Sequence, residues 1–266
     1  ERPDPGAVER VDVYASLLTV KMDDFSRAFV RHEASSPVTV NFYLPYNVAA
    51  GIMDGELTPV QFTPNRIRDT AVWNLARRVR VHHDLHLTGL VLDELARIID
   101  MRYVVRHMNW RALSQILRQV GPAPFSRIAG YKPIHETLRD AANILYRSFK
   151  TRAETRQGEF VPDDIASFRM NFGARVRITL KNGRVLESEQ DVPYGAAGRP
   201  LEEKRIEVIR KFRQEAALSL PGKAVGHAIN RISDFENLDH AAVRNLVQIC
   251  AGATEPGKAR QQRAAL

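Results

Sequence analysis

The sequence has a single cysteine and no long apolar run. Because Cys250 is the only cysteine in 266 residues, no disulfide can form within the chain, and a reducing, cytoplasmic compartment suits it best. No stretch approaches the roughly 20 apolar residues that cross a bilayer, so we expect no membrane partner. Neither a Walker sequence nor G-x-G-x-x-G occurs, and Gly195 and Gly198 are more simply explained by a turn than by a phosphate site.

The chain is basic without a concentrated basic segment. Its formal net charge is +8, a bias that would suit nucleic acid, an acidic lipid surface or a polyanionic metabolite. The Lys and Arg residues are spread over every segment and interleaved with acids, and no aromatic stripe or zinc-knuckle spacing accompanies them. We therefore expect a solvated basic surface and no nucleic-acid partner; binding to nucleic acid would instead predict affinity that falls steeply with salt.

Hydrophobic periodicity predicts a short series of strands followed by helices. Alternation over residues 11–15 runs into an apolar stretch at 17–20, which predicts one strand, and residues 25–36 are expected to form a loop. A second short strand is predicted at 79–82. Two alternating runs flank Asn182-Gly183, which favours a hairpin with a type I′ turn. From Glu202 onward the pattern is helical.

The stretch 44–55 predicts a helix with a tyrosine in its first turn. Pro45 suits the first helical position, and Gly55 supplies a left-handed stop. The free N–H groups and the dipole at such a helix start attract anions, so Tyr46 would lie where a carboxylate could bind. A phenol has a pKa of about 10 and is a proton donor near neutral pH. The competing interpretation is a packed tyrosine whose hydroxyl finds a backbone partner.

These elements predict an α+β fold with a small, mostly antiparallel sheet packed with helices. Asn65 is expected to cap a helix over residues 66–78. Three helix-period patterns punctuated by proline fill residues 88–158, and we interpret this segment as a helical insertion. Residues 1–87 and 159–253 would then form the main domain, and residues 254–266 a flexible tail.

Several motifs, taken in order, are similar to one known family. They are FYLPYNVAAGIMDG at 42–55, FTPNRIRDTAVWNLARRVRV at 62–81, VRITLKNGRVLESEQDVPYGAAGRP at 176–200 and KFRQEA at 211–216, with Arg31 and His32 upstream of the first. Together they resemble the C-terminal domain of the MmgE/PrpD family, which includes 2-methylcitrate dehydratase, cis-aconitate decarboxylase and an iminodisuccinate epimerase. The resemblance covers residues 8–84 and 174–251.

The resemblance implies cofactor-independent chemistry at a carbon next to a carboxylate. Members of the family combine a larger helical N-terminal domain with a smaller α+β lid domain, usually form homodimers, and place the active site between the two domains. This chain resembles only the lid. It is expected to be a fragment, a processed chain or a separate subunit, to need a helical domain or companion subunit, and to be inactive alone.

Three residues are candidates for the site. The resemblance matches Tyr46 to the tyrosine of the family's LPY motif, an active-site residue in relatives, and matches His32 to a histidine often found upstream of it. Arg31 and His32 would bind a substrate carboxylate, Arg by its two-pronged geometry and His by its pKa near 6.5. An exposed loop of ordinary charge is the alternative for both. The family often has Gly-His after the hairpin, where this chain has Gly195-Ala196.

The sequence HHDLH at 82–86 also raises the question of a metal. His82 and His86 are four residues apart, which would place them together on a helix, but His82 ends a strand pattern and no Glu follows it as zincins require. We therefore expect no metal site.

Two functions follow from these observations. The first is the C-terminal lid of a lyase or isomerase, of the dehydratase or decarboxylase type, that acts on a small di- or tricarboxylate. The alternative is a non-catalytic protein-interaction module derived from such a lid, with the 88–158 segment as a binding surface.

Overall fold

The computed structural model describes residues 2–98 and 168–251, together with isolated positions 111, 139, 143 and 146. Within these ranges a four-stranded sheet has the order β2-β1-β3-β4. Its strands are β1 (Val8–Ala15), β2 (Val79–His83), β3 (Ala174–Leu180) and β4 (Val185–Gln190). Most of the 88–158 segment and the whole 254–266 tail lie outside the described residues, so both assignments stay predictions.

The sheet is mixed, which corrects the expectation of a mostly antiparallel one. β1 pairs with β3 and β3 with β4 in antiparallel fashion, but β1 and β2 are parallel, with Val11 opposite Val79. Parallel neighbours need a long crossover connection. Residues 17–76 supply it here as α1 (Leu17–Arg27), α2 (Pro37–Asn41), α3 (Leu44–Asp54), α4 (Pro64–Ile67) and α5 (Thr70–Ala76). The α+β class is confirmed.

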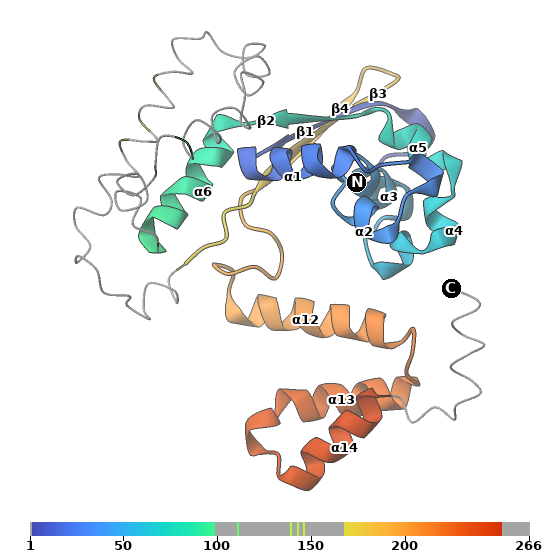
Figure 1. Cartoon of the computed structure of the whole chain (residues 1–266), viewed down its shortest axis with the longest axis vertical. Coiled ribbons are helices and arrows are strands. Elements are labelled where there is room, and N and C mark those ends of the chain that lie inside the picture. The colour runs from blue at the N-terminus through green and yellow to red at the C-terminus, as the bar shows by residue number, and fades with distance from the viewer. Residues whose placement is uncertain are drawn as a thin grey trace.

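The helices of this crossover cover one face of the sheet (Figure 1). Alternation along β1 directs Val11 and Val13 into this core, where Val72 and Trp73 of α5 are also buried. The other face is polar. There Asp12 Oδ1 lies 2.8 Å from His82 Nε2, and the Arg175 guanidinium lies 4.7 Å from the centre of the Tyr14 ring.

Helix α1 replaces the end of the predicted first strand and the start of the predicted loop. Ser16 ends the strand because its hydroxyl accepts from the Thr19 N–H and caps the helix. Asn65 likewise does not cap a long helix: Thr63 caps α4 and Asp69 caps α5, so two short helices occupy this segment. The strand predicted at 79–82 is confirmed as β2.

The hairpin after residue 173 is confirmed, but its turn is not type I′. Gly183 has a φ of 83°, whereas Asn182 is not among the positive-φ residues. A type I′ turn needs positive φ at both central residues. The Gly183 N–H donates to Leu180 O, and the Leu180 N–H donates to Arg184 O, which closes a loop with one left-handed glycine.

The C-terminal part is helical, as predicted. It contains α12 (Leu201–Ala216), α13 (Gly222–Ser233) and α14 (His240–Cys250), which Figure 1 shows below the sheet and its covering helices. Not one residue of α12 is buried. Helix α6 (Leu85–Ile98) follows β2 directly. No helix among the described residues is both long and apolar enough to cross a membrane.

Candidate active site

Helix α3 forms as its sequence predicts. Pro45 lies in the first turn, and Gly55 ends the helix with a φ of 82°. Tyr43 occupies the N-cap position, but its side chain makes no hydrogen bond to the free N–H groups of the first turn. The start of α3 therefore depends on a partner from elsewhere.

That partner is Asp23 of α1. Its Oδ1 accepts a hydrogen bond from the Leu44 N–H at 2.9 Å, and its Oδ2 lies 2.7 Å from Arg27 Nη2, with only 1% of the carboxylate side chain exposed. Burial raises the pKa of Asp23, against the opposing effect of Arg27. The anion position at this helix start, which we expected a substrate to use, is thus already filled by the protein's own carboxylate. Sequence reasoning missed Asp23 because it assigned no element to residues 21–24.

Tyr46 lies inside the core rather than at a surface. Its side chain is fully buried, and its hydroxyl donates to the Gln61 carbonyl oxygen at 2.6 Å. The ring centre is 5.1 Å from that of Trp73 and 6.3 Å from that of Phe62. Burial raises the pKa of Tyr46 to about 12. This geometry is that of the packed tyrosine with a backbone partner, and the proton-transfer role stays a prediction.

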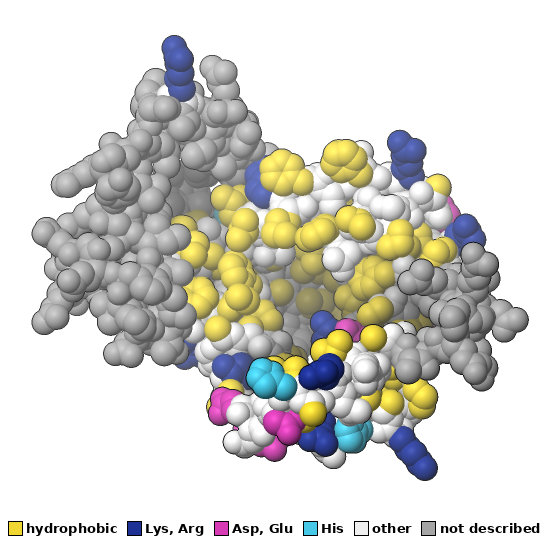
Figure 2. Space-filling model, turned by 60° about the horizontal axis from the view of Figure 1, so that its bottom comes forward, with side chains coloured by type: hydrophobic (Ala, Val, Ile, Leu, Met, Phe, Trp, Pro, Cys, Tyr) yellow, Lys and Arg dark blue, Asp and Glu magenta, His cyan; other side chains and the backbone are white. Residues whose placement is uncertain are grey.

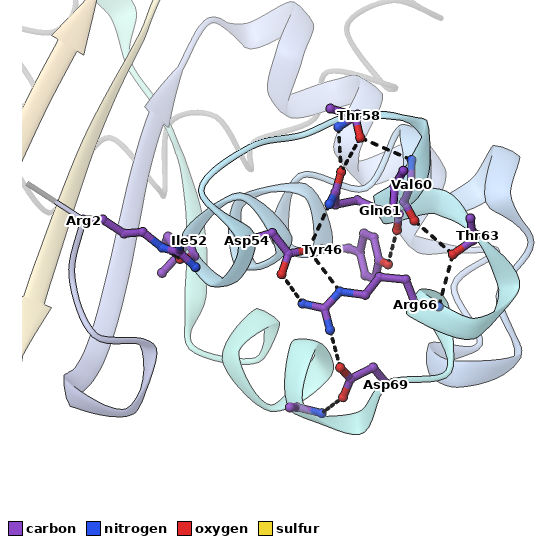
Figure 3. A network of polar contacts seen from close by, with 11 residues as sticks. Arg2, Tyr46, Ile52, Asp54, Thr58, Val60, Gln61, Thr63, Arg66 and Asp69 are labelled. Atoms are coloured by element: carbon purple, nitrogen blue, oxygen red, sulfur yellow. Dashed lines mark hydrogen bonds and ion pairs between the residues drawn. The ribbon is translucent and has the colours of Figure 1, made fainter. Parts of the chain in front are cut away.

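A polar network holds the turn around Gln61, whose carbonyl oxygen accepts the hydrogen bond from the Tyr46 hydroxyl (Figure 3). The Gln61 side chain accepts from the Thr58 N–H at 2.8 Å and donates to Asp54 Oδ2 at 3.1 Å. The Arg66 guanidinium donates two hydrogen bonds to the Asp54 carboxylate, at 3.1 and 2.6 Å. It also forms an ion pair with Asp69. The network ties the end of α3 to the turn that covers Tyr46. The T-x-x-Q spacing of a capping box was the sequence signal for it.

Arg31 and His32 lie on the exposed connection between α1 and α2. Both are exposed, and His32 has a φ of 50°, the only non-glycine residue with positive φ in the described ranges. Such a conformation is strained and persists only where the surroundings fix it. Here the Arg31 N–H donates to Ser35 Oγ at 2.8 Å, and the imidazole meets Trp73 edge-on at 5.4 Å.

Trp73 therefore connects the candidate residues. The rings of His32 and Tyr46 both contact this indole, but His32 lies at the surface and Tyr46 in the interior. Tyr43, which the sequence analysis did not select, stacks on the same indole at 6.3 Å and is half-buried. Its position one residue before α3 was available from the motif FYLPY.

The histidines of residues 82–86 have separate surroundings. His82 pairs with Asp12, whereas His83 Nε2 lies 2.8 Å from the hydroxyl of Thr88. Burial lowers the pKa of His83. His86 follows Asp84, which accepts from the His86 N–H at 2.8 Å as α6 begins. Across the described residues, no group of three or more His, Cys, Asp or Glu side chains converges as metal ligands would.

One known family matches part of the chain. Residues 1–109 match the model of the MmgE/PrpD C-terminal domain. This segment is similar to the MmgE/PrpD C-terminal domain. The match confirms the resemblance over residues 8–84 and extends through α6. No curated protein matches the chain.

The resemblance at 174–251 lies outside the residues matched by the MmgE/PrpD model. The fold nevertheless joins the two parts, because β3 pairs with β1 from Val8 to Ala15. The β3–β4 hairpin thus completes the sheet on which the helices of the MmgE/PrpD segment pack.

Proposed function

We propose that this chain is the C-terminal lid of a cofactor-independent lyase or isomerase acting on a small di- or tricarboxylate. The observation that carries the proposal is the match of residues 1–109 to the MmgE/PrpD C-terminal domain. In the proposed reaction a base in a helical partner domain removes a proton next to a carboxylate, or carbon dioxide leaves. The lid contributes groups that bind the carboxylates and exclude water.

Helix α1 supports the need for a partner domain because it exposes an apolar stripe and buries two polar side chains. The buried side of the helix carries Asp23 and Ser26 beside Val20, while Leu18, Met22 and Phe25 are 49%, 44% and 67% exposed. The spacing of these three residues places them on one stripe. Figure 2 shows hydrophobic side chains gathered over a broad face of the molecule, with few charged ones among them. An apolar stripe of this kind marks an interaction surface.

Arg31 and His32 follow this stripe in the chain and are both exposed. Within the described residues, no ion pair is formed by the Arg31 guanidinium, so its two-pronged face is available to a carboxylate. A partner domain covering α1 would bring its own groups close to these side chains. The proposed site is therefore at the edge of the lid and not at the buried Tyr46.

A non-catalytic interaction module is the second candidate. The observation that favours it is α12, whose Leu201, Ile206 and Val208 are 78%, 57% and 63% exposed. With the apolar stripe of α1, such surfaces suit a protein whose role is to bind another protein. This candidate needs no substrate.

The experiment that separates the two joins the chain with its helical domain or companion subunit. The complex is incubated with 2-methylcitrate, citrate and cis-aconitate, and the products are followed by ultraviolet absorbance of the conjugated double bond and by release of carbon dioxide. Turnover by the complex but not by the chain alone supports the enzyme. A stable complex that converts none of these acids, with added metal or without it, supports the module.

A further inference from the structure

Tyr43 is a second phenol at the start of α3, and it is half-buried at the edge of the core. Its backbone adopts the extended conformation of a helix N-cap, with φ −98° and ψ 99°. The ring stacks on Trp73 with an interplanar angle of 24°, and the Arg27 guanidinium lies 5.8 Å from the ring centre. These two contacts restrict the position of the ring.

The hydroxyl of Tyr43 is available, unlike that of Tyr46. Among the described residues it makes no hydrogen bond, and its oxygen is not among the buried polar atoms that lack a partner. Solvent therefore reaches it. The Tyr46 hydroxyl, by contrast, donates a hydrogen bond to Gln61 O at 2.6 Å.

Tyr43 has charges of both signs near it, those of Arg27 and Asp23. Arg27 is beside the ring, and its own carboxylate partner Asp23 is nearly completely buried. Arg31 and His32 lie on the connection that follows α1, and the imidazole contacts the indole on which Tyr43 stacks. Burial raises the pKa of Tyr43, with Arg27 acting in the opposite direction, so the phenol keeps its proton at neutral pH and can donate.

We propose that Tyr43 is a substrate-binding residue of this lid, whose hydroxyl donates a hydrogen bond to a ligand carboxylate that Arg31 and His32 also bind. The inference rests on the proposed function, because it assigns that function's carboxylate to a particular place. It also differs from the assignment by motif, which selected Tyr46. Tyr43 lies three residues earlier in the chain and outside the core.

The test measures ligand binding to the full chain through the fluorescence of one tryptophan. Trp73 and Trp110 are the only tryptophans, so a Trp110→Phe background leaves Trp73 as the reporter of His32 and Tyr43. The probe is tricarballylate, an unreactive tricarboxylate, titrated while indole fluorescence is recorded. Saturable change in the fluorescence gives the dissociation constant.

Tyr43→Phe keeps the ring, its stacking and its contact with Arg27, and removes only the hydroxyl. A hydrogen bond to a charged group is worth roughly 1.5–3 kcal/mol, so this variant should bind about tenfold or more weakly. Tyr46→Phe is the matched control and should bind within about twofold of the parent. Thermal unfolding of each variant shows that it is folded.

Two results would overturn the inference. One is a Trp73 signal that tricarballylate does not change at any concentration; the other is Tyr43→Phe binding as tightly as the parent. Arg31→Gln and His32→Gln should also weaken binding, and unchanged affinity in both would argue against the site. Turnover by the complex with its helical domain tests the proposed function separately, because the tricarballylate titration requires no reaction.

Discussion

Replacing Tyr46 with phenylalanine distinguishes a structural phenol from a catalytic one. The variant keeps the ring contacts with Trp73 and Phe62 and removes the hydroxyl that donates to Gln61 O. Gln61 O then loses a buried hydrogen bond. Leaving a buried group unpaired costs about 1–3 kcal/mol, so we expect the free energy of unfolding to fall by about 1–2 kcal/mol. Urea denaturation at constant pH measures this difference.

The raised pKa of Tyr46 adds a pH signature to the same variant. Its pKa is about 12 in the folded protein and 10.0 as the unperturbed value, so the native state binds the proton more tightly than the unfolded state between these pH values. The stability that this proton supplies is complete below pH 10 and is lost as pH rises toward 12. Two pKa units correspond to at most about 2.7 kcal/mol. The stability difference between wild type and Tyr46→Phe should narrow over this range.

Activity supplies the outcome that would refute this reasoning. If Tyr46 only packs, the variant complex should retain activity at temperatures where it is folded. General acid–base catalysis by a positioned group contributes roughly 10²–10⁴-fold. A loss of that size, with unchanged unfolding in urea and no narrowing at alkaline pH, would show that the phenol acts on substrate and that its bond to Gln61 opens.

Substitutions at four further positions probe the supporting contacts. Asp23→Asn keeps an oxygen for the Leu44 N–H, whereas Asp23→Ala leaves it unpaired, so the alanine variant should be about 1–2 kcal/mol less stable in urea, and equal stability would contradict the cap. Arg66→Lys loses the double hydrogen bond to Asp54 and should cost about 1 kcal/mol or more by the same measurement; no loss would mean that the network is not stabilising. Desolvation acts to raise the pKa of Asp12, but hydrogen bonds from His82 and Arg10 hold it below 3.8. The contribution of Asp12 to the free energy of unfolding is therefore present above pH 3.8 and is lost as the pH falls through the lowered pKa. Asp12→Asn should reduce this loss of stability at acid pH, measured by unfolding at a series of pH values. Burial lowers the pKa of His83 from 6.5, so wild type should lose stability relative to His83→Gln as pH falls below that value, and parallel pH profiles would refute it.

Local signals in the sequence predicted the elements that depend on local chemistry. Pro45 and Gly55 predicted α3 at both ends, and alternation around Gly183 predicted the β3–β4 hairpin. The turn type was wrong because a single left-handed glycine is enough when the loop is longer than two residues. The parallel pairing of β1 and β2 could not be predicted, because strand direction in a sheet is set by the tertiary path and not by alternation.

The candidate site was predicted less well because its decisive contacts are long-range. The motif selected Tyr46 correctly as a residue of the α3 start, but nothing local distinguishes a phenol facing the core from one facing solvent. Burial of Tyr46 depends on Gln61, fifteen residues away, and the cap at Leu44 depends on Asp23, twenty-one residues away. The capping-box spacing at Thr58 could have indicated the turn that covers Tyr46.

The burial of Asp23 in helix α1, which the sequence analysis missed, also bears on the proposed function. Amphipathic helices of isolated domains turn apolar residues inward, yet α1 buries Asp23 and Ser26 together with Val20. Asp23 faces inward because α3 has no cap of its own, and Leu18, Met22 and Phe25 are thereby left on the outer side. An exposed apolar stripe of this kind fits a helix that is covered by a partner. Substituting Phe25 with serine should therefore leave the chain folded but weaken its complex with the helical domain, whereas a fully stable complex would show that this stripe is not the interface.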